Sequence, residues 1–202
     1  PNVAGQNCIL NWGAVQGNTE YRLLQWATDS HYFNFGNGGF TAVDLDITAG
    51  PQLFSITKLG SSSEWYNFGS NVKTSSAAGT IGTNSATFSI GGGYGDSSGI
   101  HYWYSYISEV IVYNYALNPT QRQQVEGYLA WTWGIQSRLP PGHLARNSPP
   151  QAYYGALSAG PIMWYDATDS STMTFEISDV SGLTFLPSTL PQLQLWFDAY
   201  DA

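Results

Sequence analysis

The sequence predicts an all-β protein, an antiparallel jelly-roll sandwich that carries one short C-terminal amphipathic helix. Short stretches rich in aromatic and β-branched residues recur at even spacing, separated by breaks that contain Gly, Asn or Asp. Only the stretch after residue 118 has the periodicity of a helix. Hydrophobic residues make up 43% of the 202 residues and charged residues 10%, which is typical of a folded chain with a neutral polar surface.

The strands are expected before residue 115. In order, they are NCILNWG (7–13), YRLLQWA (21–27), HYFNFGN (31–37), FTAVDLDIT (40–48), QLFSITK (52–58), EWYNFGSNVKTS (64–75), SATFSIGGG (85–93) and YISEVIVYN (106–114). The 64–75 segment predicts a hairpin that turns near Phe68-Gly69-Ser70-Asn71. YISEVIVYN has apolar residues on both faces, which indicates a central strand. Glu109 lies within it and, if buried, needs a partner such as a backbone N–H or an Arg, so we interpret it as a structural carboxylate.

The helix is expected near residues 118–137. Asn118 is a suitable N-cap, and Pro119 is favoured at the first helical position. Gly134 and then Pro140-Pro141 predict its end. The face that should pack on the sandwich has a spacing of i, i+3, i+4 and i+7, and it consists of Val125, Tyr128, Leu129 and Thr132. Trp131 and Trp133 are expected to add to that contact.

The domain organisation changes after His143. Residues 144–160 are rich in Pro, Gly, Ala and Ser and predict a linker. Beyond the linker, MWYDATD (163–169) recurs as LWFDAYD (195–201), with the Trp, the Ala and both Asp residues identical. We therefore expect 1–143 to form the jelly roll and 161–202 to hold a linker module and the start of one or more repeats. The second phrase stops close to the last residue, so the chain is expected to be a fragment of a longer polypeptide.

Charge and cysteine content narrow the classes of partner. The net charge is −8, and six Lys and Arg residues are too few for a surface that follows a phosphate backbone, so nucleic acid is not an expected partner. No apolar run is long enough to predict a membrane-spanning helix, and a membrane is not an expected partner either. Cys8 stands alone in an apolar context, which indicates a buried thiol rather than a disulfide.

Several phrases together resemble a known family. FSITKLGSSSEWYNFGSNV, GTIGT, FSIGGGYG and YISEVIVYNYALNPTQRQQVEGYLAWTWGIQSRLPPGH are similar to concanavalin A-like, laminin-G-like jelly-roll domains, over roughly residues 7–150. The helix-bearing tail from Glu109 to His143 is the most specific part. Such domains occur in multi-copy proteins of large DNA viruses of algae and amoebae and in some secreted bacterial proteins. A phrase like LWFDAYD opens a domain in that family, so the resemblance implies that Trp164 and Trp196 begin further copies. It also implies that the first domain is truncated at its N-terminus.

The fold of this family also includes glucanases, whose retaining mechanism needs two carboxylates about 5 Å apart. In those enzymes the acids come from one strand as Glu-x-Asp-x-(x)-Glu. The nearest match here is Asp44-Leu45-Asp46, with Ile47 and Thr48 where the next acid is needed. Glu109 has no acidic neighbour at the required spacing, and neither a nucleophile motif nor a zinc motif is present. We therefore expect no enzymatic activity, and a glycoside hydrolase is the least favoured function.

Calcium is the one cofactor that the sequence leaves open, since loop carboxylates suit hard cations. Asp44 with Asp46, or Asp96 with Ser97 and Ser98, are the candidate ligands, and solvated loop carboxylates are the competing interpretation. Neither stretch is dense enough in ligands to specify a site, so no cofactor is predicted.

Glycan binding is the sharpest functional hypothesis. The candidate ligand-binding residues lie in and after the loop GGGYGDSSG, and they are Tyr94, Asp96, Ser97 and Trp103. Aromatic faces stack on sugars, while Asp and Ser side chains bond to hydroxyls. Strand alternation places Tyr102 and Tyr104 opposite Trp103, so we expect Tyr94 to be more exposed than those two tyrosines.

The sequence and the resemblance together favour a non-enzymatic structural protein of a virion, located in a minor capsid, spike or fibre component. Its lectin-like domains would attach to host cell-surface polysaccharide. The expected partners are other virion proteins or further copies of the chain. The alternative is a secreted, extracellular, multidomain carbohydrate-binding or adhesion protein.

Overall fold

The computed structural model describes residues 6–12, 21–26, 30–35, 40–44, 50–76, 88–94, 100–103, 106–113, 115–150, 163–166 and 194–200. Within these residues the chain is mostly strands, and every strand pairing is antiparallel. One α-helix, α1 (Pro119–Thr132), and one short 3-10 helix, η2 (Gln136–Arg138), complete the described elements. The expectation of an all-β protein with a single short α-helix is confirmed for this part of the chain.

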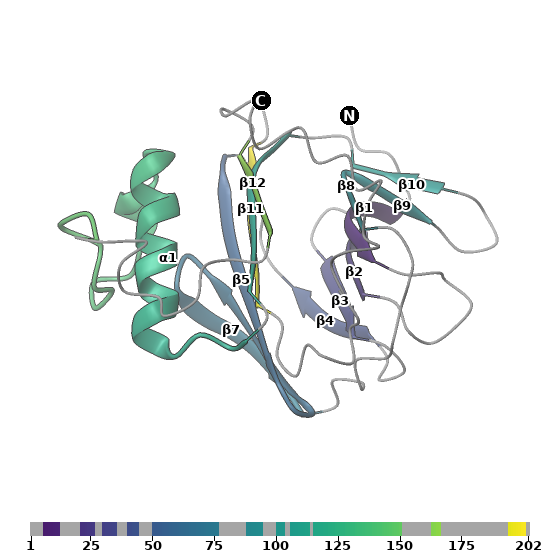
Figure 1. Ribbon diagram of the computed structural model, residues 1–202, viewed down its shortest axis with the longest axis horizontal. Coiled ribbons are helices and arrows are strands. Elements are labelled where there is room, and N and C mark those ends of the chain that lie inside the picture. Colours follow the sequence, from purple (N-terminus) through teal and green to yellow (C-terminus); the bar gives the residue numbers. More distant parts are fainter. Residues whose placement is uncertain are drawn as a thin grey trace.

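The strands form three sheets (Figure 1). The five-stranded sheet has the order β4-β3-β2-β1-β8 and consists of β4 (Phe40–Asp44), β3 (Ser30–Phe35), β2 (Tyr21–Trp26), β1 (Gln6–Trp12) and β8 (Phe88–Ile90). The six-stranded sheet has the order β12-β11-β13-β5-β6-β7 and consists of β12 (Met163–Asp166), β11 (Tyr106–Tyr113), β13 (Gln194–Tyr200), β5 (Gln52–Leu59), β6 (Ser62–Asn67) and β7 (Ser70–Ser75). β9 (Gly92–Tyr94) and β10 (Ile100–Tyr102) form a separate pair. Figure 1 shows the six-stranded sheet between α1 and the five-stranded sheet.

β5 is covered on both faces by the rest of the molecule. Every residue from Gln52 to Lys58 is buried, although the strand alternates apolar and polar residues. Leu53 belongs to the core cluster beneath α1, and the Ser55 hydroxyl bonds to a side chain of that helix. A strand that is covered on both faces exposes none of its side chains to solvent, so the polar side chain of Ser55 needs a partner inside the protein.

The hairpin between β6 and β7 turns where the sequence predicts. Phe68 and Gly69 form the two-residue loop, and both have positive φ, 47° and 79°. Two consecutive residues with positive φ are typical of a type I′ turn, which matches the twist of the strands it joins. Phe68 is the one described non-Gly residue with positive φ, and it is held by a hydrogen bond from its N–H to the Leu53 carbonyl and by burial in the core.

The start of α1 is as predicted, and the helix ends close to Gly134, where the sequence predicts a stop. The Asn118 side chain accepts a hydrogen bond from the Gln121 N–H, and the Gln121 side chain accepts one from the Asn118 N–H, which completes a capping box. Gly134, with φ of 70°, ends the helix in the left-handed conformation common after a C-cap. The α-helix therefore stops at Thr132, short of the expected 137, and the 3-10 helix η2 follows at Gln136–Arg138.

The face of α1 that packs on the sheet differs from the expected one. Val125 and Leu129 are fully buried, and Tyr128 packs against the same core, as predicted. Thr132, however, is exposed, because the buried face is centred closer to the start of the helix. The helix also buries Arg122, Glu126, Gly127 and Ala130, so two of its buried positions are charged. The core cluster around this face contains Leu53, Phe68, Ile111, Tyr113, Leu117, Val125, Leu129, Ala130, Ile135, Leu139 and Ala145.

β11 lies inside the six-stranded sheet, as its two apolar faces predict. It pairs with β12 on one side and with β13 on the other. These two strands contain the repeated phrases MWYD and LWFDAY, and the family resemblance predicts that these phrases start further copies. The structure places both phrases in one sheet beside β11, and the assignment of domain boundaries from 144 onward stays a prediction.

Candidate functional site

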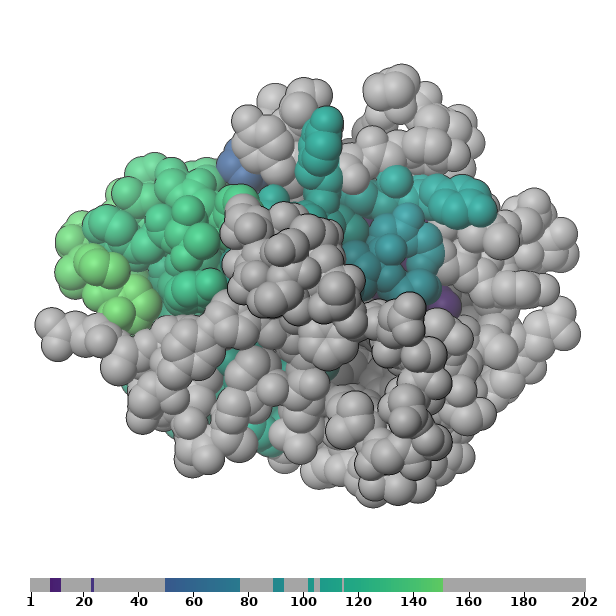
Figure 2. Space-filling view, turned by 45° about the horizontal axis from the view of Figure 1, so that its top comes forward, coloured from purple at the N-terminus to yellow at the C-terminus, as the bar shows by residue number. Residues whose placement is uncertain are grey.

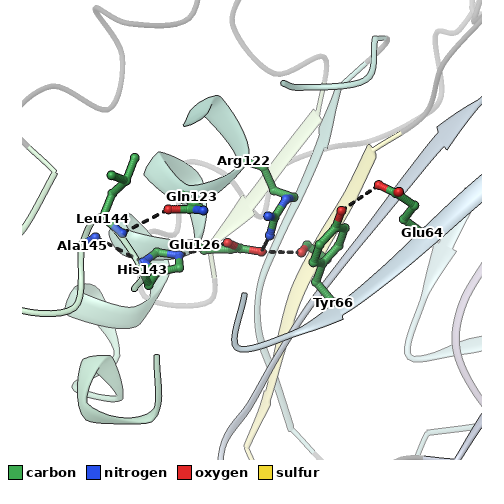
Figure 3. A network of polar contacts seen from close by, with 9 residues as sticks. Glu64, Tyr66, Arg122, Gln123, Glu126, His143, Leu144 and Ala145 are labelled. Carbon is green, nitrogen blue, oxygen red and sulfur yellow. Dashed lines mark hydrogen bonds and ion pairs between the residues drawn. The ribbon is translucent and has the colours of Figure 1, made fainter. Parts of the chain in front are cut away.

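Glu126 lies at the centre of a buried polar network between α1 and the six-stranded sheet (Figure 3). Its side chain is 0% exposed, and both carboxylate oxygens have partners. Oε1 accepts from the Ser55 hydroxyl at 2.7 Å and from Arg122 Nη1 at 2.5 Å. Oε2 lies 3.0 Å from His143 Nε2. Three elements distant in the chain, β5, α1 and the segment after Pro141, therefore converge on one carboxylate.

Arg122 connects this network to β6. Its guanidinium carbon lies 3.6 Å from the centroid of the Tyr66 ring, so the cation is stacked on the aromatic face. The Tyr66 hydroxyl in turn donates to Glu64 Oε2 at 2.6 Å. Burial, followed by the bond to Glu64, raises the pKa of the Tyr66 hydroxyl above its usual value. The phenol is thus kept in the protonated form that donates to Glu64.

The geometry around His143 defines its tautomer. The backbone N–H of Ala145 donates to His143 Nδ1 at 3.1 Å, so Nδ1 is an acceptor and carries no proton. The proton is therefore on Nε2, which donates to Glu126 Oε2. Beside it, the Leu144 N–H donates to the Gln123 side chain at 3.0 Å. These bonds hold the 143–145 segment along the helix, and the Trp131 indole adds a bond to the Ala145 carbonyl at 2.7 Å.

Gly69 allows the β6–β7 turn to approach the network closely. A Cβ atom at this position would lie 2.6 Å from His143 Cδ2 and 3.1 Å from Glu126 Oε2. Its φ of 79° is also a conformation that residues with a side chain rarely adopt. The turn is therefore packed directly on the His143–Glu126 pair, and only glycine fits there.

Gly69→Ala is expected to destabilise the protein by about 1 to 3 kcal/mol, because it combines backbone strain with a steric clash. Gly60→Ala is the matched control, since Gly60 has a φ of 59° but no atom within 4 Å of the added Cβ. Urea unfolding of both variants separates the two effects. Equal losses would show that the contact with His143 contributes nothing beyond the strain.

The network has the properties of a structural site rather than a reactive one. Glu126 has no exposed surface, its oxygens are fully engaged with protein groups, and His143 is buried with it. A general acid or base must reach a substrate proton directly or through a water molecule, and this carboxylate reaches only protein donors. What the arrangement does is join α1 to the sheet through hydrogen bonds that are inaccessible to solvent.

Glu109 has a similar structural role on β11. It is fully buried, and its Oε2 accepts a hydrogen bond from the Trp133 indole at 2.9 Å. The sequence predicts a structural carboxylate whose partner is a backbone N–H or an Arg, for example, and the structure shows a partner of another kind, the Trp133 indole. This bond attaches the C-terminal end of α1 to β11, as the Glu126 network attaches its middle to β5.

The predicted glycan-binding residues are only partly within the described chain. Tyr94 lies in β9, where its backbone pairs with Ile100, while Asp96 and Ser97 lie outside the described residues. Trp103 follows β10 and is half-buried. Its N–H donates to the Gly91 carbonyl at 3.0 Å, and its indole donates to the Tyr106 carbonyl at 3.4 Å. The structure does not describe how these four side chains lie relative to one another.

Tyr102 differs from the sequence expectation. It is 53% exposed, although alternation placed it on the side expected to be more buried. β10 pairs with β9 alone among the described strands, so it belongs to neither of the two larger sheets. Tyr106, at the start of β11, is 62% exposed. Tyr102 and Tyr106 are thus exposed and Trp103 is half-buried, all within five residues of the chain, and Figure 2 shows teal atoms from this part of the sequence at the surface.

The candidate calcium ligands also lie largely outside the described part. Asp44 ends β4, and Asp46, Asp96, Ser97 and Ser98 are not described. Among the described residues, no group of three or more His, Cys, Asp or Glu side chains is arranged to hold a metal ion. Within the same residues, α1 is too short and too polar to cross a membrane, and no other helix meets that requirement.

Sequence reasoning did not identify the Glu126 network. Arg122 and Glu126 have i, i+4 spacing, which usually indicates an exposed helical ion pair. The available signal was that both lie in phase with Val125 and Leu129, on the face that packs.

Comparisons of the chain with models of protein families, with curated proteins and with solved structures found no match.

Proposed function

We propose that this chain is a non-enzymatic structural module of a virion, within a minor capsid, spike or fibre component, and that it attaches to host polysaccharide through exposed aromatic residues. The proposed fold is a concanavalin A-like jelly roll. Supporting it are the five-stranded and six-stranded antiparallel sheets and the one described α-helix, which lies on the outer face of the six-stranded sheet. The virion context rests on the resemblance of the 54–143 phrases to laminin-G-like domains of large DNA viruses.

The observation that carries the proposal is the contrast between the two sets of side chains. The carboxylates of Glu126 and Glu109 are fully buried and accept hydrogen bonds from protein groups. The aromatic groups at the β10–β11 end, Tyr102 and Tyr106, are more than half exposed. These two carboxylates are thus engaged inside the molecule, whereas the aromatic rings of Tyr102 and Tyr106 face solvent. Exposed aromatic rings are suited to stacking on sugar rings.

A second candidate function is a secreted, extracellular carbohydrate-binding or adhesion protein. The same exposed aromatics favour it, because they do not depend on a virion. The two functions share the binding surface and differ in assembly, since a shell or fibre component must bury large surfaces against neighbouring subunits.

The test of the binding surface is retention on polysaccharide. Beads carrying many copies of the chain supply the avidity that a weak single site needs, and they are applied to cellulose, chitin and mannan columns. We expect retention of the wild type on at least one column, and reduced retention for Tyr94→Ala and Trp103→Ala. Tyr102→Ala tests the residue that the structure adds.

Leu59→Ala is the matched control, because Leu59 is 58% exposed at the β5–β6 turn, away from this strand end. It should not change retention. If the wild type passes through all three columns, the attachment role is contradicted. Retention that no aromatic substitution alters, with the fold intact by circular dichroism, would show that the binding surface lies elsewhere.

A further inference from the structure

β11 receives the same short phrase on both of its sides. MWYD of β12 pairs with it on one side and LWFD of β13 on the other, both antiparallel (Figure 1). The two registers agree at four successive positions: Val112 is opposite Met163 and Leu195, Ile111 is opposite Trp164 and Trp196, Val110 is opposite Tyr165 and Phe197, and Glu109 is opposite Asp166 and Asp198. Equivalent residues of the repeat thus take equivalent positions along β11.

Backbone hydrogen bonding alone does not impose this agreement. In an antiparallel strand the N–H and C=O of one residue point to the same neighbour, so a hydrogen-bonded pair on one side is a non-hydrogen-bonded pair on the other. Ile111 therefore forms a hydrogen-bonded pair with the Trp of one phrase and a non-hydrogen-bonded pair with the Trp of the other. Equivalent residues of the two phrases nevertheless lie opposite the same residues of β11. A slip by one position would move every residue to the other face, so the shared register indicates that residue identity selects it.

β13 occupies a place between two strands, which we call the β5–β11 slot. On its second side it pairs with β5, from Gln194 opposite Thr57 to Ala199 opposite Gln52. The occupant of the slot therefore forms ladders on both edges, whereas β12 pairs with β11 alone among the described strands. A strand in the slot is bound by two backbone ladders, and the sheet is divided without it.

We propose that the β5–β11 slot is a site of strand exchange, in which the W-[FY]-D-A phrase of one copy of this chain pairs with β5 and β11 of a second copy. The second copy is the partner because it carries the phrase that fills the slot here. The phrase at 163 differs from that at 195 only by Met for Leu and Tyr for Phe over the paired tetrad. Addition of a strand with backbone ladders is an established mode of association between chains.

This inference rests on the structural part of the proposed function, for which it names the partner and the joint. It requires no glycan. An exchanged strand links two copies because it completes the sheet of its neighbour in place of that neighbour's own β13, so a chain with two phrases is able to connect more than two molecules.

Cysteine pairs across the register provide the test. One variant carries Thr57→Cys and another carries Gln194→Cys, at positions that face each other across β5 and β13. Either kind of antiparallel pair lies within the Cα separation that a disulfide spans. The two variants, distinguished by mass, are unfolded together, refolded and oxidised. The native Cys8 is fully buried and stays in place.

The expected result is a covalent heterodimer of the two variants, in a fraction that rises with protein concentration. A chain carrying both substitutions should form the same disulfide within one molecule at low concentration. Gln194→Cys with Lys58→Cys is the register control, since Lys58 is one position away and on the opposite face. If the double variant closes within one chain while the mixed variants yield only monomers, exchange is contradicted. A double variant that forms no disulfide contradicts the register itself.

A mixture of the Ile162→Cys and Thr57→Cys variants tests whether the first phrase also enters the slot. Residue 162 precedes MWYD as residue 194 precedes LWFD, so it should take the same position opposite Thr57. The exchange model predicts a disulfide here in the refolded mixture, and its absence would restrict the slot to the phrase at 195. Light scattering of the wild type measures self-association independently. Self-association without a mixed disulfide would leave the structural function standing and overturn the exchange.

Discussion

Glu126→Gln lowers the free energy of unfolding by about 3 to 5 kcal/mol, because it leaves the buried Arg122 without its counter-charge. The amide keeps the shape of the side chain, but it has one acceptor oxygen instead of two. Its NH₂ group is a donor, and it faces other donors in either orientation: those of Ser55 and Arg122, or the Nε2 proton of His143. Urea unfolding followed by tryptophan fluorescence gives the difference.

Two controls make this result specific. Glu64→Gln makes the same chemical change at a residue that is not buried, and we expect a loss of less than about 1 kcal/mol there. The double replacement Arg122→Met with Glu126→Leu removes both charges, and it should recover part of the loss, since no buried charge is left unpaired while the Ser55 and His143 donors still lack an acceptor. A Glu126→Gln protein as stable as the wild type would show that the network does not hold α1 on the sheet.

Leu129→Ala is expected to destabilise the protein by about 2 to 5 kcal/mol, through lost burial and the cavity that remains. Leu129 is fully buried in the core cluster between α1 and the sheet, next to Val125 and Ala130. Thermal unfolding by circular dichroism measures the effect. Thr132→Ala is the control on the same helix, because Thr132 is exposed and Ala is a good helix former, so its melting temperature should be unchanged or slightly higher. A Leu129→Ala melting temperature equal to that of the wild type would contradict the packing of the helix.

The features that the sequence predicts well are those set by near neighbours. The predicted N-cap at Asn118 is decided by residues 118–121, and the turn at Phe68 and Gly69 depends on two residues. The central position of β11 follows from its own apolar faces. In each case the residues that decide the structure lie within one short window, where propensity and periodicity apply.

The features that it does not predict depend on partners distant in the chain. Ser55 is 71 residues from Glu126, and His143 is 17 residues from it. Periodicity identifies Val125 and Leu129 as buried, but it assigns charged residues on the same face to solvent. The exposure of Tyr102 was missed for a related reason, since alternation within a strand does not reveal whether a second sheet covers it. The placement of β13 between β5 and β11 is likewise a long-range pairing that no local pattern specifies.

The position of β13 has a consequence for the order in which the chain folds during synthesis. β5, β6 and β7 form one antiparallel set early, and β11 with β12 forms another, but the described strands join these sets only through β13. The ribosome makes residues 194–200 last among the described elements, so until that strand emerges no described strand pairing joins the two sets, and their shared packing on α1 connects them. During this interval the edges of β5 and β11 present unpaired N–H and C=O groups. The hydrogen bond between Ser55 and Glu126 then helps to keep β5 on α1.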